Sequence, residues 1–102
     1  MKIKMFFAAL IIGVVVACGG SAGGESNELG ANVFKTHCQL CHGADGKLGL
    51  NGAKDFTTSP LSLDERIQVI TKGRNTMLAY ENTLSPEEIK AVAKYTLTFK
   101  GK

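Results

Sequence analysis

The chain has 102 residues, of which 12 are Lys or Arg and 9 are Asp or Glu, so its net charge at neutral pH is only +3. No stretch interleaves basic with aromatic residues, and together with the low charge this excludes nucleic acid as a partner. The length allows one small domain, whose modest core often needs a disulfide, a metal or a bound group to stabilise it.

Residues 1–17 are predicted to be a signal peptide. Lys2 and Lys4 give a basic start, and the apolar run from Met5 to Ala17 is shorter than the ~20 residues that a membrane-spanning helix needs. The end of this run, Val15-Val16-Ala17-Cys18, resembles the lipobox of bacterial lipoprotein precursors, which implies that Cys18 becomes a lipidated N-terminus. The alternative is an ordinary secretory signal, which would leave a free thiol in an oxidising compartment. We therefore expect an exported protein, lipid-anchored at the membrane surface on the periplasmic side or on the outer face of the cell membrane.

Residues 18–26 are rich in Gly and Ser and show no apolar periodicity, so we predict a flexible, lipid-anchored linker. The linker would hold the domain of residues 27–102 close to the membrane.

Once Lys2 and Lys4 leave with the signal peptide, ten basic and nine acidic residues remain. We therefore expect partners to recognise a local patch rather than the net charge.

The first helix is predicted from Leu29 to about Gln39 and leads into Cys38-Gln39-Leu40-Cys41-His42. Two thiols three residues apart, followed at once by an imidazole, are the pattern of covalent haem attachment, in which the histidine ligates the iron. A thioredoxin-like redox pair is one alternative, but such a pair normally lies on a βαβ unit, and no strand pattern flanks Cys38. A zinc cluster that includes His37 is another, but four ligands within six residues do not readily close a tetrahedron.

The segment from Gly43 to Thr58 has a glycine at every third position over its first half and is predicted to be an irregular loop. Loops of this length are uncommon unless they are functional. We expect this one to wrap the proximal face of the haem, with a backbone carbonyl near Leu50 to Gly52 accepting the Nδ1 proton of His42. Such a bond would direct Nε2 toward the iron.

Two capping boxes predict the remaining helices. Ser62-Leu63-Asp64-Glu65 opens a helix that runs to about Lys72 and stops at Gly73, with Leu63, Ile67 and Ile70 on one face. Ser85-Pro86-Glu87-Glu88 opens the last helix, with proline at its first position. The buried stripe of this helix is expected at Ile89, Val92, Ala93, Thr96 and Leu97. Since no segment has a convincing strand pattern, we predict an all-α fold.

Met77 is the only methionine that remains after removal of the signal peptide. Methionine usually fills gaps in a core, but Met77 lies in a polar segment between two predicted helices, which favours a role as ligand. Its thioether can reach the iron from the side opposite His42. His37 precedes Cys38 on the same helix and cannot easily reach that side, which argues against a second imidazole. An open or water-filled distal site and lysine ligation are the alternatives.

These features together resemble the class I cytochrome c family, and more narrowly its small monohaem members made as bacterial lipoproteins. Gly30, Phe34 and Tyr95 match the family's crossing of the first and last helices. The attachment motif and the distal ligand match at Cys38, Cys41, His42 and Met77. The chain departs from the family in having Asn51-Gly52 where members often carry Gly-Pro, and Leu78 where many have proline after the ligand methionine. The resemblance implies a cytochrome c fold, with three to four short helices around one covalent haem c.

With both axial positions filled by protein, the easy chemistry is the passage of one electron through the exposed haem edge. We therefore expect an electron carrier that is not an enzyme and that is a monomer. Its partners would be membrane respiratory complexes or other redox proteins, with Lys35, Lys47 and Lys54 as weak candidates for the docking patch. A haem peroxidase or gas sensor with an open distal site is one alternative. A haem subunit held permanently in a larger redox complex is the other.

Overall fold

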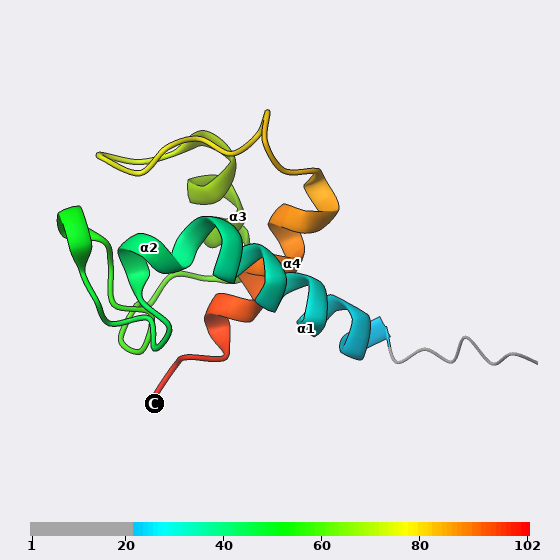
Figure 1. Cartoon of the computed structure of the whole chain (residues 1–102), viewed down its shortest axis with the longest axis horizontal. Helices are drawn as coiled ribbons and strands as arrows, with labels where there is room; N and C mark the ends of the chain where they lie inside the picture. The colour runs from blue at the N-terminus through cyan, green and yellow to red at the C-terminus, as the bar shows by residue number, and fades with distance from the viewer. Residues whose placement is uncertain (1–21) are drawn as a thin grey trace, which may run out of the picture.

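The computed structural model describes residues 22–102, which form helices joined by long loops (Figure 1). The predicted signal peptide and Cys18 lie outside the described residues. In chain order the elements are α1 (Ala22–Val33), the π-helical turn η1 (Phe34–Cys38), α2 (Gln39–His42), the 3₁₀ turn η2 (Leu50–Gly52), α3 (Leu63–Lys72) and α4 (Pro86–Leu97). Within the described range the β pairing amounts to one isolated bridge, between Arg74 and Met77. The prediction of an all-α fold is confirmed. No helix in this range is long and apolar enough to cross a membrane.

The first helical segment is longer than predicted. α1 begins at Ala22 rather than at Leu29, and helical backbone continues through η1 and α2 to His42. Extending an existing helix adds one hydrogen bond per residue without a second nucleation cost, so residues 22–26 can be helical despite their glycines. The prediction of a linker without secondary structure is therefore wrong for residues 22–26.

α1 and α4 cross, as Figure 1 shows, and Gly30 of α1 lies against α4 near Ala91 and Tyr95. A β-carbon on Gly30 would overlap the Ala91 carbonyl oxygen and would lie 2.9 Å from the Tyr95 β-carbon. Next to the crossing, the buried ring of Phe34 lies 5.3 Å from the ring of Tyr95 and 5.3 Å from that of Phe99, measured between centroids. The helix crossing implied by the family resemblance is thus present, and only glycine fits at its closest point.

The rest of the core lies between α3 and α4. The stripe predicted on α4 is buried at Ile89, Val92, Ala93 and Thr96, whereas Leu97 is only partly buried. On α3, Ile70 is buried, and Leu63 and Ile67 pack against the core from its margin. α4 therefore packs against α1 near Ala91 and Tyr95 and bonds to α3 at Thr96.

Both predicted capping boxes are present. The Ser62 hydroxyl accepts a hydrogen bond from the Glu65 backbone N–H, and the Glu65 carboxylate accepts one from the Ser62 backbone N–H. Ser85 and Glu88 repeat the arrangement at the start of α4, with Pro86 at the first helical position. These four bonds satisfy N–H groups that a helix start otherwise leaves without partners.

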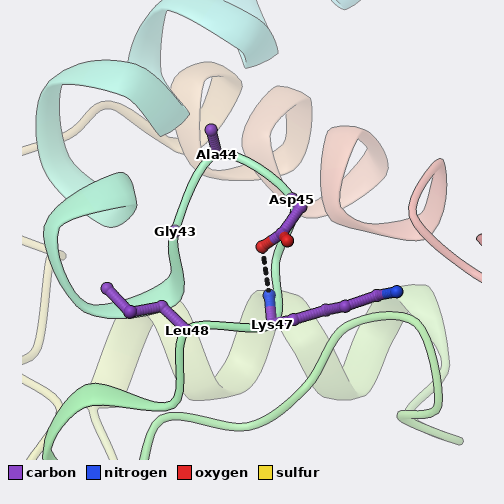
Figure 2. Close-up of a pocket in the computed structure, with 5 residues that line it drawn as sticks. All are labelled: Gly43, Ala44, Asp45, Lys47 and Leu48. Atoms are coloured by element: carbon purple, nitrogen blue, oxygen red, sulfur yellow. Dashed lines mark hydrogen bonds between the residues drawn. The ribbon is translucent and has the colours of Figure 1, made fainter.

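The chain leaves α2 through a tight turn, residues 43–48, which surrounds a hollow of about 400 Å³ (Figure 2). The backbone N–H of Leu48 donates to the His42 carbonyl at 2.9 Å, and that of Lys47 donates to the Asp45 carboxylate at 2.9 Å. Gly43 has a φ of 80° and would place a β-carbon 2.8 Å from that of Leu48, so glycine is required there. The turn fixes the direction in which the predicted irregular loop, which contains η2, departs from His42.

Candidate functional site

A cavity of about 460 Å³ lies among η1, α2, the loop that carries η2, α3 and the segment before Tyr80. The four residues predicted to hold a haem all lie on its wall, namely Cys38, Cys41, His42 and Met77. Apolar side chains from other elements complete the wall, among them Leu61, Val69 and Ile70. The fold therefore brings the predicted attachment motif and the predicted distal ligand to one mostly apolar space.

The two thiols of the motif, Cys38 and Cys41, are both free and partly buried. The pKa of the Cys38 thiol is raised to about 11, mainly by burial and to a smaller extent by the neighbouring charge of Cys41. A redox-active Cys-x-x-Cys pair needs the opposite shift, because the thiolate is the reactive form. The structure thus gives no support to the thioredoxin-like alternative. Within residues 22–102 no group of three or more His, Cys, Asp and Glu side chains is arranged to hold a metal ion, so the zinc alternative finds no site there.

His42 is buried and held in one orientation. Its Nδ1 lies 3.2 Å from the Lys54 carbonyl oxygen, and because a carbonyl only accepts, Nδ1 carries the proton. The Phe56 ring stacks on the imidazole at 4.3 Å between centroids and 19° between planes. Burial lowers the pKa of His42, partly offset by the bond to Lys54. At neutral pH the imidazole is therefore neutral, with Nε2 available to a metal.

The carbonyl that accepts this bond is not the one expected. We predicted a carbonyl near Leu50 to Gly52, whereas the acceptor is the carbonyl of Lys54, two residues further along the chain. The Leu50 carbonyl accepts from the Ala53 N–H at 3.0 Å, and the Asn51 carbonyl accepts from the Thr76 hydroxyl at 2.8 Å. The Lys54 carbonyl lies beyond this self-bonded turn and is the one that pairs with His42.

Met77 lies in a turn that follows α3. Gly73 ends the helix with a φ of 77°, and a β-carbon there would lie 2.7 Å from the Met77 carbonyl oxygen. Arg74 and Met77 then exchange backbone hydrogen bonds at 2.9 and 3.2 Å, with Asn75 in the left-handed region that asparagine tolerates. The side chain of Met77 is partly buried and contributes to the cavity wall. The turn therefore presents a thioether to the cavity from a fixed backbone.

Side-chain hydrogen bonds tie this turn to both sides of the cavity. The Thr76 hydroxyl donates to the Asn51 carbonyl in η2, which joins the turn to the loop that also carries the His42 acceptor. The Tyr80 hydroxyl donates to the His37 carbonyl at 3.1 Å, which joins it to the helical segment that carries the motif. These ties hold the wall that bears Met77 against the wall that bears the motif.

Sequence reasoning missed Arg66, which is 3% exposed and lines the cavity. A signal for it was present, because Arg66 shares the helical face of Leu63, Ile67 and Ile70 at the i, i+3, i+4, i+7 spacing. Phe56, Thr76 and Tyr80 also line the cavity and were missed. They lie in irregular segments, where periodicity gives no indication of which side chain faces inward.

The fold and the donor set define the class of protein. Two thiols, a neutral imidazole with a free Nε2 and a thioether on one mostly apolar wall are what a covalently attached c-type haem requires, so the residues fit this group. The chain thus has the architecture of a small all-α haem protein.

Comparisons with known proteins identify the family. A family model described as cytochrome C oxidase, cbb3-type, subunit III, matches residues 25–95. Cytochrome c6 of Microcystis aeruginosa is 36% identical over 74 residues, which cover 67% of this chain and 90% of that protein. Cytochrome c6 of Nostoc sp. (strain PCC 7120) is 30% identical over 103 residues, which cover 92% of each chain. The crystal structure of cytochrome c6C from Synechococcus sp. PCC 7002 superposes with a TM-score of 0.63 at 30% identity, covering 72% of this chain and 95% of that one.

The chain belongs to the cytochrome c family, whose members bind one covalent haem c with its iron. The resemblance to the cytochrome c family and the cytochrome c fold are confirmed, and the lipoprotein origin stays a prediction. The individual roles of Cys38, Cys41, His42 and Met77 stay predictions.

Proposed function

We propose that this protein is a monohaem electron carrier that alternates between ferric and ferrous states. The observation that supports it best is the convergence of Cys38, Cys41, His42 and Met77 on one cavity. Its relatives support it as well, because they are cytochromes c6, which are electron carriers and not enzymes. The bound haem supplies the chemistry, a one-electron exchange at iron.

In this proposal Cys38 and Cys41 anchor the haem. Each thiol would hold the haem through one thioether bond to a vinyl group, an addition that needs no external oxidant. The high pKa of Cys38 keeps that thiol protonated until it reacts. These two bonds would fix the position of the haem independently of its axial ligands.

His42 acts as the proximal ligand and Met77 as the distal ligand. The bond from Nδ1 to Lys54 keeps Nε2 free, and the stacked Phe56 ring prevents the imidazole from turning. Relative to a second imidazole, a thioether favours ferrous iron and raises the potential. Two ligands from the chain leave no position for a substrate, which favours electron transfer over an open-site enzyme or sensor.

The exported, membrane-anchored location is part of the same proposal. The lipobox-like sequence before Cys18 supports it, and Cys18→Ala should release the protein from the membrane without altering its absorption spectrum. Persistent membrane association of that variant would contradict the lipid anchor. Membrane respiratory complexes are the partners we propose, and co-purification in mild detergent would separate a tethered carrier from a fixed subunit.

A pyridine haemochrome assay with intact mass, on protein matured in a competent host, tests the haem directly. We expect one haem c per chain and a low-spin spectrum with a sulfur-to-iron charge-transfer band. Met77→Ala should keep the haem attached, remove that band, lower the potential and admit carbon monoxide. Asn82→Ala, the control, truncates an exposed side chain five residues away that does not line the cavity and should keep all four properties. An unchanged spectrum in Met77→Ala would remove Met77 from the ligand set, and a high-spin native spectrum that responds to peroxide would favour the enzyme.

A further inference from the structure

The tripeptide Lys54-Asp55-Phe56 contacts the His42 imidazole in two ways. The Lys54 carbonyl oxygen lies 3.2 Å from Nδ1, at the edge of the imidazole ring. The Phe56 ring covers a face of the imidazole, with 4.3 Å between the centroids and 19° between the planes. One short segment therefore holds both an edge and a face of the predicted proximal ligand.

The hydrogen bond to Lys54 by itself leaves the plane of the imidazole some freedom to turn. At 3.2 Å it lies at the long end of the range for N–H···O bonds, and such bonds weaken steeply only when the angle at the hydrogen falls below ~120°. A rotation of the ring within that tolerance would keep the bond. The same rotation would drive an edge of the imidazole into the face of Phe56, because the two rings are already close to contact. The contact with Phe56 is therefore the stricter restraint on the plane.

Phe56 is itself held in place on several sides. A β-carbon on Gly46 would lie 3.2 Å from the β-carbon of Phe56 and 3.3 Å from its Cδ2, so the Gly46 backbone packs directly against this side chain. The Phe56 N–H donates to the Gly46 carbonyl at 3.1 Å. The rings of Phe34 and Phe99 each lie 6.1 Å from the Phe56 ring, measured between centroids. Backbone and rings together give the imidazole a fixed wall to rest on.

Asp55 holds the backbone that joins the two contacts. Its carboxylate accepts hydrogen bonds from the Thr57 backbone N–H at 2.8 Å and from the Thr57 hydroxyl at 2.6 Å. Its carbonyl accepts a bond from the Ser59 N–H at 3.0 Å. A bond from a backbone N–H to an aspartate side chain two residues earlier defines an Asx turn. Asp55 does not line the cavity, so its effect on His42 passes through this turn.

We propose that Phe56 and Asp55 are positioning residues that fix the plane of the His42 imidazole on the haem iron. Phe56 does so by covering the ring, and Asp55 by holding the turn that presents both Phe56 and the Lys54 carbonyl. The inference rests on the proposed function, because it takes His42 as the proximal ligand. In low-spin ferric haem the plane of an axial imidazole decides which porphyrin positions carry unpaired spin. The paramagnetic shifts of the haem methyl protons therefore report this plane.

The first test compares two phenylalanines of the same aromatic cluster in the full-length holoprotein. Phe56→Leu removes the ring that covers His42. Phe99→Leu is the matched control, because Phe99 is buried against Phe56 but does not line the cavity. Both variants should unfold at lower denaturant concentration, since each loses a packed ring. We expect only Phe56→Leu to change the order and spread of the haem methyl shifts in the ferric proton NMR spectrum. Phe56→Tyr keeps a ring and should keep the native pattern.

The second test concerns the turn. Asp55→Ala removes the acceptor for Thr57 and should move the methyl shifts in the same direction as Phe56→Leu, by a smaller amount. Asp55→Asn keeps an acceptor oxygen and should restore the native pattern. Ser85→Ala is the control, because it removes a side-chain acceptor of a backbone N–H at the start of α4, outside the cavity wall. It should lower stability without moving the methyl shifts.

Methyl shifts in Phe56→Leu that match those of the native protein, or that change only as they do in Phe99→Leu, would overturn the inference and leave Phe56 as a core residue. Native shifts in Asp55→Ala would remove Asp55 from the positioning role. Should Phe56→Leu fail to fold, the difference between Asp55→Ala and Asp55→Asn decides. A native protein that lacks haem in the haemochrome assay would instead contradict the proposed function.

Discussion

The α1–α4 crossing and the cavity wall use similar apolar residues but cover them differently. At the crossing, Val92 and Ala93 are 0% exposed, and the backbones approach until only Gly30 fits. At the cavity, Leu40 and Leu78 are 80% and 72% exposed although both belong to its wall. At the crossing, the chain buries its own apolar residues. At the cavity, apolar residues stay exposed, as expected for a site that a bound apolar group covers.

The difference in exposure indicates that the two regions have different sources of stability. The crossing depends on the steric fit between α1 and α4, so the addition of a single carbon atom should lower its stability. The region around the cavity depends instead on a bound group. Without that group, apolar side chains of the wall such as Leu40 and Leu78 remain in contact with water, and the domain loses the free energy of their burial.

The largest effect should follow loss of haem attachment. The double variant Cys38→Ser, Cys41→Ser cannot form thioethers, and we expect it to lack covalent haem and to be largely unfolded by circular dichroism. Gln39→Ala changes a position inside the same motif that does not line the cavity and keeps both thiols, so it should retain haem and helix content. A haem-free double variant with native helix content would show that the chain completes both regions unaided.

A single methyl group should test the packed region. Gly30→Ala places a β-carbon against the Ala91 carbonyl oxygen, and because backbone cannot move aside, the holoprotein should lose about 1–3 kcal/mol in denaturant unfolding. Asn32→Ala introduces the same residue at an exposed position of α1 and should be neutral or slightly stabilising, since alanine favours helix. Equal effects of the two substitutions would mean that the crossing is not the constraint we describe.

Local signals made the packed region predictable from sequence. Ser62 and Ser85 begin helices as their capping boxes indicated, and the apolar spacing on α4 identified its buried face, except at Leu97. The start of α1 was missed, because glycines near Ala22 suggest a linker and only the continuing helix overrides them.

The cavity was predictable only where residue chemistry is distinctive. Cys38, Cys41, His42 and Met77 stand out by type, and all four line one cavity. The acceptor for His42 was misplaced, because which carbonyl of a loop is free depends on hydrogen bonds, such as that from Thr76 to Asn51, that join residues distant in sequence. Arg66 was missed because a charged residue on an apolar face usually signals an exposed edge rather than a buried partner.

A smaller effect is expected from loss of the hydrogen bond between Tyr80 and His37, which joins the two walls of the cavity. Tyr80→Phe removes the hydrogen bond to the His37 carbonyl, which is worth about 1 kcal/mol, so imidazole should displace Met77 from ferric iron about fivefold more readily. Tyr95→Phe makes the same chemical change at the helix crossing and should leave imidazole affinity unaltered. Spectrophotometric titration with imidazole measures both. Identical imidazole affinities in the two variants would show that the Tyr80 hydroxyl does not help to keep Met77 on the iron.

The smallest effect concerns acid sensitivity at the start of α4. Hydrogen bonds from the backbone and side chain of Ser85 lower the pKa of Glu88 below its ordinary value. Because the pKa in the folded state is lower than in the unfolded state, this carboxylate stabilises the fold above the ordinary glutamate pKa of about 4.3. The contribution is lost as the pH falls through the pKa of Glu88 in the folded state.

Glu88→Gln keeps an acceptor for the capping box but removes the titrating group. The unfolding free energy of this variant should therefore fall less steeply between about pH 5 and 3 than that of the native protein. Glu87→Gln, one residue away and outside the box, should retain the native slope. A flattened slope in Glu88→Gln alone would tie acid stability to the α4 cap, whereas parallel slopes in all three proteins would assign it to other carboxylates with lowered pKa values, such as Asp55 and Glu65.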